Sequence, residues 1–303
     1  MKLKQLQQIS NTDIKLLKIF KTVCECGSFT SAESMLGISR SAISLHISDL
    51  EQRVGFRLCQ RGRAGFALTE EGKELLEYSE ILLVSIEDFR VKVNQIHNKL
   101  KGEFNIGIIN NLVTMPNSNV THTLRQLSNE HPDVKINISM STLSDIESKV
   151  LDGRLHVGAI PFVASLSGLN YFDLYEEKSF LYCGNKHPLF SSTTLLLKND
   201  LKKWDAVTPN YNITAEAINL HQLLNCKATA TDREGIAFLI LTGNFLGFLP
   251  DHYASKWVQE QKMKSIFKSE ITYNTKICLI TKKSKANNII LNYFLEIIRL
   301  NAK

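Results

Sequence analysis

Histidine and cysteine, the side chains with the widest chemical range, are scattered along this chain. No two of the eight histidines form the i, i+4 pair that binds zinc on a helix, and the six cysteines lack the paired spacing of a zinc site. The sequence also has no Gly-x-Ser-x-Gly, Gly-Lys-Ser/Thr or Gly-x-Gly-x-x-Gly motif. It therefore predicts a binding protein with no cofactor, and an enzyme that uses the later part of the chain is a remote alternative.

A short stretch near the N-terminus carries polar groups suited to reading DNA. A helix is predicted from Ser39 to about Arg53, and apolar positions at helical spacing along it and directly after it predict one buried stripe. The members of this stripe are Ile43, Ile47, Leu50 and Val54. On the opposite face, the small hydroxyl side chains of Ser41 and Ser44 would let the helix approach a groove closely. Arg40, at the start, could reach a guanine edge in the major groove. An ordinary amphipathic surface helix is the alternative.

Two further helices precede this one. Apolar spacing predicts a helix over residues 12–24 that ends at Gly27. Thr30 and Glu33 match a capping box that would begin a short second helix, which stops at Gly37. The candidate caps of the three helices are Asn11 or Thr12, Thr30 and Ser39. Two short helices joined by a glycine-containing turn predict a helix-turn-helix.

The segment after the third helix predicts a β-hairpin and then a long helix. Two strand-like pieces flank a turn at Gly62 and Gly65, and this hairpin would place Arg61 and Arg63 against DNA phosphates. Thr69 would cap a helix that runs to about Asn98. The apolar positions of this helix, which predict dimerisation, are Leu75, Leu82, Ile86, Phe89, Val93 and Ile96.

Length and charge divide the chain. Its 303 residues correspond to about two domains at ~150 residues each. Residues 1–68 carry a net charge of +5 and residues 69–98 a net charge of −4, which indicates a polyanionic partner for the N-terminal head. No apolar run reaches the ~18 residues that span a membrane, and the N-terminus lacks the apolar core of a signal peptide. We therefore expect a cytoplasmic protein without membrane contact.

The remainder alternates between strand and helix patterns. Strands are predicted over 104–109, 134–140 and 155–160, with helices between them, which indicates a parallel βαβαβ sheet. A second α/β unit follows, with strands near 206–207 and 228–230 and a helix over 234–242. The chain then returns with a strand over 271–281 and a helix over 286–299. Two such lobes would place a ligand cleft at the carboxyl ends of their strands.

The cysteines leave open one alternative way in which the protein could be switched. They are expected to be buried or half-buried free thiols, because nothing near them indicates a disulfide framework. A redox-responsive regulator of the same architecture, switched through Cys183 and Cys226, is the alternative to a metabolite sensor.

At this point the sequence resembles the LysR-type transcriptional regulators over nearly its whole length. The head matches at Gly27-Ser28-Phe29-Thr30, Ala32, Leu36, Ser39, Ala42-Ile43-Ser44, Ile47, Leu50-Glu51, Gly55, Arg61 and Leu68-Thr69-x-x-Gly72. The remainder matches at Gly107, His131-Pro132, Gly153-Arg154-Leu155, His187-Pro188-Leu189, Gly235-Ile236-Ala237 and Leu249-Pro250. The resemblance implies an α/β protein with an N-terminal winged helix-turn-helix and a two-lobed effector domain like a periplasmic binding protein.

The chain departs from the family pattern within the recognition helix. The usual Gln-Pro is Arg40-Ser41, and the usual polar or basic residue after the recognition serine is Leu45, which could contact a thymine methyl group. These departures leave the operator sequence open. The residues that we expect to contact DNA are Thr30, Ser39, Arg40, Ser41, Ser44, Leu45, His46, Arg61 and Arg63.

The resemblance also implies an effector pocket between the lobes. Loops after the strands would supply its amide and hydroxyl groups, which at helix N-termini suit a carboxylate or another polar anion. The residues that we expect to line it are Asn110, Asn111, Leu112, Ser141, Thr142, Pro209, Tyr211 and Thr231. Asn110, Asn111 and Thr142 could instead be simple helix caps, because caps and ligand contacts use the same residue types.

The expected organisation and partners follow from these assignments. The expected domains are a DNA-binding head at 1–68, a dimerisation helix at 69–101 and an effector domain at 102–303, with lobe I at 102–178 and 270–303 and lobe II at 179–269. The expected partners are double-stranded DNA with an imperfect palindrome, further copies of the chain as a homodimer and homotetramer, a small-molecule effector and RNA polymerase.

Overall fold

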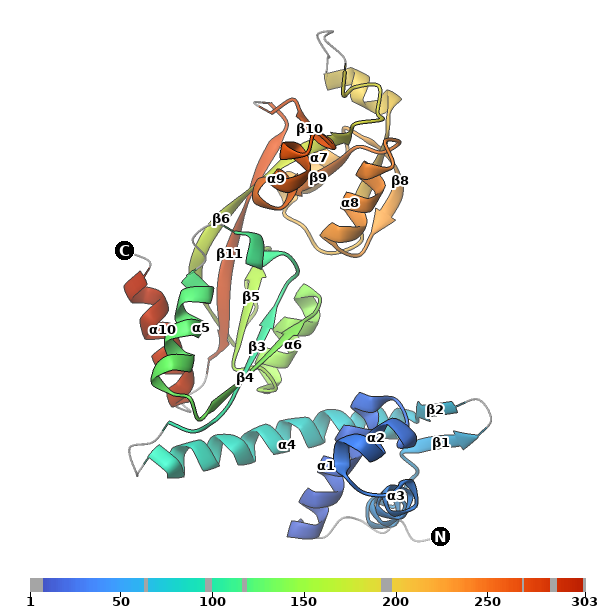
Figure 1. Cartoon of the computed structure of the whole chain (residues 1–303), viewed down its shortest axis with the longest axis vertical. Helices are drawn as coiled ribbons and strands as arrows, with labels where there is room; N and C mark the ends of the chain where they lie inside the picture. Colours follow the sequence, from blue (N-terminus) through green and yellow to red (C-terminus); the bar gives the residue numbers. More distant parts are fainter. Residues whose placement is uncertain are drawn as a thin grey trace. The chain divides into compact units, whose positions relative to one another are not determined.

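The computed structural model describes residues 8–62, 65–95, 100–115, 119–191, 198–268, 270–283 and 288–301. The chain divides into two compact units, Met1–Val93 and Asn94–Lys303 (Figure 1). Each unit has its own buried apolar side chains. The first unit therefore includes most of the long helix as well as the expected head.

The first unit is a winged helix-turn-helix. Its elements are α1 (Asn11–Cys26), α2 (Phe29–Leu36), α3 (Arg40–Val54), β1 (Cys59–Gly62), β2 (Gly65–Leu68) and α4 (Glu70–Gln95). Ile43, Ile47 and Leu50 of α3 are at most 1% exposed and pack with Phe20 and Val23 of α1. The predicted buried stripe of the third helix is confirmed at these three positions, whereas Val54 is only partly buried.

Gly37 and Gly55 end the two helices of the motif. Their φ angles are 66° and 87°, in the left-handed region that side chains with a Cβ avoid. The amide of Gly37 donates to the carbonyl of Glu33, and that of Gly55 donates to the carbonyl of Glu51. These bonds satisfy the last helical carbonyls and turn the chain sharply, as the glycine positions predict.

The predicted helix starts were wrong for the first two helices. The cap of α1 is Ser10, whose hydroxyl accepts from the amide of Asp13 while the Asp13 carboxylate accepts from Ser10. The cap of α2 is Ser28 rather than Thr30, and the Glu33 carboxylate accepts from the backbone amide of Arg40. Glu33 thus connects α2 to the start of α3 instead of closing a capping box. Ser39 caps α3 as predicted.

The start of α4 packs tightly on the segment before the wing. The hydroxyl of Thr69 accepts from the amide of Gly72, which confirms the predicted cap. A Cβ at Gly72 would lie 2.0 Å from the carbonyl oxygen of Leu58, so only glycine fits there. Leu75 and Leu82 pack on the core of the head, whereas Phe89 is 69% exposed. The helix is described to Gln95, and the predicted positions 96–98 lie outside the described residues.

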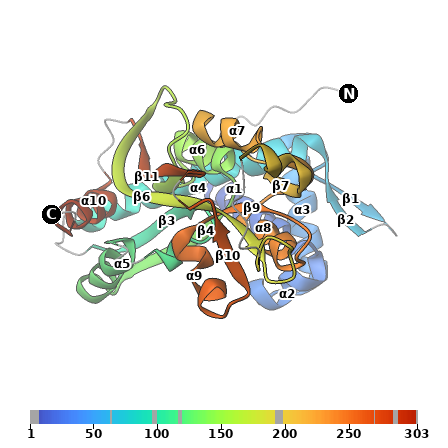
Figure 2. The ribbon, with the colours of Figure 1, turned by 90° about the horizontal axis from the view of Figure 1, so that it is seen from above.

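The second unit begins with the predicted parallel sheet. Its first elements are β3 (Gly102–Ile108), η1 (Leu112–Thr114), α5 (Asn119–Glu130), β4 (Val134–Met140), α6 (Leu143–Asp152) and β5 (Val157–Pro161). β3 pairs in parallel with both β4 and β5, so the βαβαβ prediction is confirmed. The C-terminal helix α10 (Ile289–Asn301) lies beside α5 in both views (Figures 1 and 2), and its Phe294 packs on Phe104 of β3.

Two long strands then connect this sheet to a second group of elements. β6 (Leu169–Gly184) pairs antiparallel with β11 (Thr272–Lys282) along the full length of β11. The other elements are η2 (Lys198–Lys203), β7 (Asp205–Pro209), α7 (Ala215–His221), β8 (Asn225–Ala230), α8 (Arg233–Leu241), β9 (Gly247–Pro250), α9 (Asp251–Gln259) and β10 (Met263–Ile266). β9 and β10 pair with β6, while β7 and β8 form a separate parallel pair. Figure 1 shows β6 and β11 passing between the two groups.

The ion pair between Asp13 and Arg53 gives the first testable prediction. Asp13 is 2% exposed, and hydrogen bonds from Arg53 and Ser10 hold the pKa of its carboxyl well below the usual value. Asp13→Asn should speed hydrogen exchange of the α1 and α3 amides by about tenfold, which corresponds to about 1.4 kcal/mol. Glu25→Gln, on the exposed side of α1, should leave exchange unchanged.

The pH dependence of this effect follows from the direction of the shift. Since the folded-state pKa of Asp13 is lowered, its stabilisation is complete above the ordinary carboxyl pKa of about 3.9 and is lost as the pH falls below it. The Tm difference between wild type and Asp13→Asn should therefore be constant from pH 7 to 5 and narrow below about pH 4. A difference that vanished at pH 6 would contradict this assignment.

Candidate functional site

The outer face of α3 presents polar and small side chains. Arg40 and Ser41 are exposed, Leu45 is 62% exposed, and Ser44 and His46 are half-buried. These residues lie opposite the buried stripe, where the sequence predicted a DNA-reading surface. Within the described part of the chain, the Arg40 guanidinium has no carboxylate partner, so its charge is available to a nucleic acid.

Ser39 and Thr30 differ in how free they are to contact DNA. The hydroxyl of Ser39 accepts from the amide of Ala42 and lies 2.9 Å from the hydroxyl of Ser41, so its first role is to cap α3. Thr30 is exposed in the first turn of α2. Both positions therefore lie near the start of a helix, where backbone amides suit phosphate oxygens.

The wing is a two-stranded hairpin in the predicted place. β1 and β2 pair antiparallel from Cys59 with Leu68 to Gly62 with Gly65. Phe66 of β2 packs edge to face on Phe29 of α2, with ring centroids 5.7 Å apart. Arg63 and the Arg61 side chain lie outside what the structure describes.

The second unit contains a pocket of about 280 Å³ at the predicted strand ends. Five of the residues expected to bind an effector line it, and these are Asn110, Ser141, Thr142, Tyr211 and Thr231. The other lining residues are Ile109, Met140, Leu143, Pro161, Asn212, Asp232 and Arg233. Residues from the β3–β5 group and from the β7–β8 group thus face one space, as the two-lobe prediction requires.

Two helix N-termini meet at this pocket. Thr142 caps α6 by accepting from the amide of Asp145, and Asp232 caps α8 by accepting from the amide of Gly235 at 2.7 Å. Each helix N-terminus presents a partial positive charge, which favours an anion. Thr142 is therefore both a cap and a pocket residue, while Asn110 lines the pocket without a cap bond among the described residues.

Three of the expected effector residues are not gathered in this pocket. Leu112 is 7% exposed and belongs to the 3₁₀ turn η1. Asn111, before it, adopts a left-handed φ of 72°, and its side-chain nitrogen is buried without a partner among the described residues. Pro209 lines a neighbouring hollow beside His221.

Arg233 and its partner Glu177 were missed by the sequence analysis. The Arg233 guanidinium lines the pocket and forms a two-pronged ion pair with the carboxylate of Glu177, with a 3.0 Å bond from Nη1 to Oε2. The side chain of Glu177 is fully buried and that of Arg233 is 13% exposed. Burial raises the pKa of the neighbouring Tyr211 phenol, which therefore stays protonated as a donor. The pocket thus has a fixed guanidinium beside it, with Glu177 as its counter-charge.

Glu177 also holds His252 of α9. The Nε2 atom of His252 lies 2.9 Å from Oε2 of Glu177, and because a carboxylate only accepts, this nitrogen donates. The Nδ1 atom lies 2.7 Å from the hydroxyl of Thr114 in η1. A continuous polar chain therefore joins η1, α9, β6 and α8.

The cysteines do not favour the redox alternative. Cys183 is buried, and burial raises the pKa of its thiol to about 11. Cys226 is exposed as a whole residue, but its sulfur is partly buried. This partial burial raises the pKa of the Cys226 thiol as well. Because the thiolate is the reactive form, raised pKa values slow oxidation at both positions. All six cysteines are free thiols.

Metal sites and membrane-spanning helices are both absent from the described ranges. No group of three or more His, Cys, Asp or Glu side chains there is arranged to hold a metal ion. No helix among those residues combines the length and apolar character needed to cross a membrane.

The Glu177 ion pair predicts a specific loss of stability. Glu177→Gln leaves the buried guanidinium of Arg233 without a counter-charge, so unfolding of the second unit should cost about 3 kcal/mol less. Both tryptophans, Trp204 and Trp257, lie in this unit, so their fluorescence reports its unfolding in urea. Glu176→Gln, the adjacent exposed position on β6, is the matched control and should be close to wild type. Equal midpoints for the two variants would contradict the assignment.

Comparison with known proteins identifies the relatives of both units. Residues 14–73 match the model of the bacterial regulatory helix-turn-helix protein of the lysR family, and residues 97–302 match the LysR substrate binding domain. The chain is 51% identical over 297 residues to the HTH-type transcriptional activator BauR of Pseudomonas aeruginosa, covering 98% of this chain and 97% of that protein.

Solved structures agree in fold. The crystal structure of CbnR, a LysR family transcriptional regulator, superposes with a TM-score of 0.69 at 19% identity and covers 96% of this chain and 99% of CbnR. Full-length CbnR complexed with its target DNA superposes with a TM-score of 0.68 at 20% identity, with the same coverage. With its winged helix-turn-helix and its effector-binding domain, the chain belongs to the LysR family of bacterial transcriptional regulators.

Proposed function

We propose that this chain activates transcription from imperfect palindromic DNA sites when a small carboxylate-bearing effector occupies the pocket beside Arg233. The observation that carries the proposal is the pocket itself, in which five effector residues expected from the sequence face two helix N-termini and a buried arginine. The relative BauR is named as an activator, which supports activation rather than repression. The proposal includes no catalytic reaction.

The chemistry of the pocket favours a carboxylate. Asp232 is occupied as the cap of α8, and the hydroxyl of Ser141 donates to the Asp145 carboxylate. The groups left for a ligand are the N–H donors of Arg233 that Glu177 does not occupy, the O–H group of Tyr211 and the side-chain amide of Asn110. These donors suit the oxygen atoms of an anion, while Ile109 and Met140 would contact its apolar part.

DNA recognition in this proposal rests on the outer face of α3. Arg40, Ser41, Ser44 and Leu45 would enter the major groove, and the exposed Thr30 would lie near the phosphates. The predicted wing contacts through Arg61 and Arg63 belong to the same proposal. A protein of this fold has been crystallised with its target DNA, which supports the general arrangement.

Assembly and location are part of the proposal. We expect a homodimer, formed in part by the exposed apolar half of α4 around Phe89 and Val93, and its association into a homotetramer. Two heads of a dimer would contact half-sites about one helical turn apart. Activation in the cytoplasm would then require contact with RNA polymerase.

Arg40 tests the DNA-binding half of the proposal. Arg40→Ala should weaken binding to the operator by about 1–3 kcal/mol and relax specificity at one base pair. Arg40→Lys keeps the charge but removes the two-pronged donor, so it should lose specificity while retaining non-specific binding. Fluorescence anisotropy on the operator and on single-base variants measures both. Equal weakening on every DNA sequence would contradict base reading by Arg40.

Asn110 tests the effector half. A thermal-shift screen of carboxylic acids against their primary amides should find stabilisation by one acid and little by its amide, because Arg233 and the helix N-termini favour the anion. Asn110→Ala should raise the Kd of that acid about 10–100-fold, since it removes one hydrogen bond to a charged group. Asn129→Ala, exposed on α5 outside the pocket, is the control. Equal affinities for acid and amide would contradict the proposal.

A further inference from the structure

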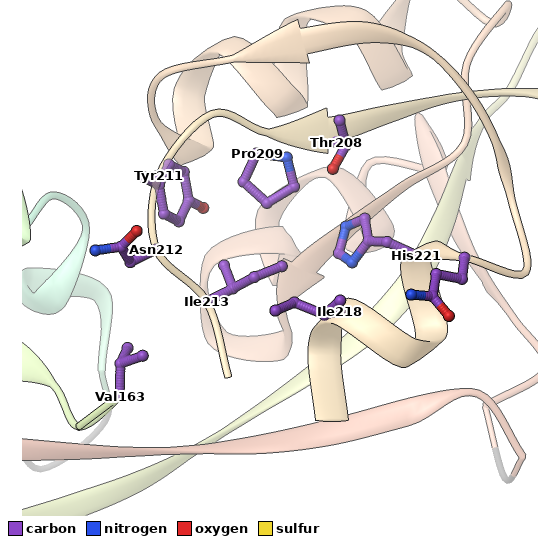
Figure 3. A pocket seen from close by; sticks show the side chains of 9 residues that line it. Val163, Thr208, Pro209, Tyr211, Asn212, Ile213, Ile218 and His221 are labelled. Atoms are coloured by element: carbon purple, nitrogen blue, oxygen red, sulfur yellow. The ribbon is translucent and has the colours of Figure 1, made fainter. Parts of the chain in front are cut away.

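A second hollow lies beside α7, and it shares few of its lining residues with the effector pocket. Its volume is about 480 Å³. It is lined by Val163, Thr208, Pro209, Tyr211, Asn212, Ile213, Ile218, His221 and Gln222 (Figure 3). Only Tyr211 and Asn212 also line the effector pocket. None of the lining side chains is an Asp, Glu, Lys or Arg, so the hollow has no charge of its own to pair with an ionic ligand.

His221 contributes an acceptor atom without a partner. The residue is 8% exposed, and its Nδ1 atom lies 2.8 Å from the carbonyl oxygen of Ala217. Because a carbonyl only accepts, Nδ1 carries the hydrogen and donates. Burial lowers the pKa of the imidazole, which is therefore neutral, and its Nε2 atom is left as an acceptor. Among the described residues this buried Nε2 has no hydrogen-bond partner.

The imidazole is held in one orientation. Its ring packs on Phe248, with centroids 5.0 Å apart, and the bond to Ala217 fixes its rotation. Figure 3 shows the ring extending from α7 toward the space beside Thr208 and Ile218. A buried polar atom without a partner is rare in folded proteins, and here it belongs to a residue that lines an accessible hollow.

We propose that this hollow is a second ligand site, which takes a small neutral molecule with an apolar body and one O–H or N–H group that donates to Nε2 of His221. Pro209, Ile213 and Ile218 would contact the apolar body. The lack of charged lining residues excludes a strong preference for an anion, which separates this ligand class from the carboxylate proposed for the effector pocket. The inference stands independently of that effector.

The direct test compares indole with 1-methylindole, two probes that differ in one N–H donor. Isothermal titration calorimetry on the full chain should show indole binding about 3–10-fold more tightly, as expected for one hydrogen bond. His221→Asn keeps a side-chain donor for the carbonyl of Ala217 but removes the Nε2 acceptor, so the preference for indole should disappear. Equal affinities of the wild type for both probes would overturn the proposal.

Two further readouts locate the binding. In the wild-type chain labelled with ¹⁵N-histidine, indole should shift the Nε2 resonance of His221 and 1-methylindole should shift it far less, whatever the stability of the variant. Asn110→Ala, in the effector pocket, should leave the affinity for indole unchanged. An unmoved Nε2 resonance, or loss of indole binding in Asn110→Ala, would place the probe elsewhere and refute the second site.

Discussion

The second unit is organised around one buried carboxylate. Glu177 lies on β6, one of the two strands that pass between the groups of elements, and its side chain is fully buried. A carboxylate in such a place is tolerated only with charged or donating partners. Arg233 from α8 and His252 from α9 supply them, and Thr114 extends the chain of contacts to η1. The pocket cation is therefore oriented by the fold before any ligand binds, which reduces the cost of ordering it on binding.

Carboxylates have a similar structural role in the first unit. Asp13 connects α1 to Arg53 of α3, Glu33 accepts from the amide that begins α3, and Glu51 accepts from the amide of Leu58 before the wing. Each acid joins two elements of the motif. These three acids are thus occupied inside the head, whereas the exposed guanidinium of Arg40 has no carboxylate partner among the described residues. This arrangement explains how a compact head with a modest excess of basic residues can present a positive surface to DNA.

Local patterns predicted the fold better than the site. Apolar periodicity identified the stripe of Ile43 on α3 and the βαβαβ order, because both depend on neighbouring residues. The strand-end rule predicted a cleft, and the family resemblance named Asn110 and Thr142, which line the pocket. Arg233 had no such signal, since its partner lies 56 residues away. Its one local clue was a charged residue at a helix start directly after a strand.

The same reasoning explains the smaller errors. Ser28 and Thr30 are both good caps two residues apart, so the sequence could not choose between them, and Glu33 had a long-range partner that the capping box did not foresee. The short helix α7 was missed because seven residues give too little periodicity.

The claim that an acid in the pocket controls binding to a specific DNA site can be tested by DNase I footprinting. The DNA is the promoter next to the gene that encodes this protein, with and without the acid that stabilises the protein. We expect protection of an imperfect palindrome, and we expect the length of the protected DNA to change when the acid is added. Equal protection of every DNA sequence would contradict this proposal. Protection whose length the acid does not change would also contradict it.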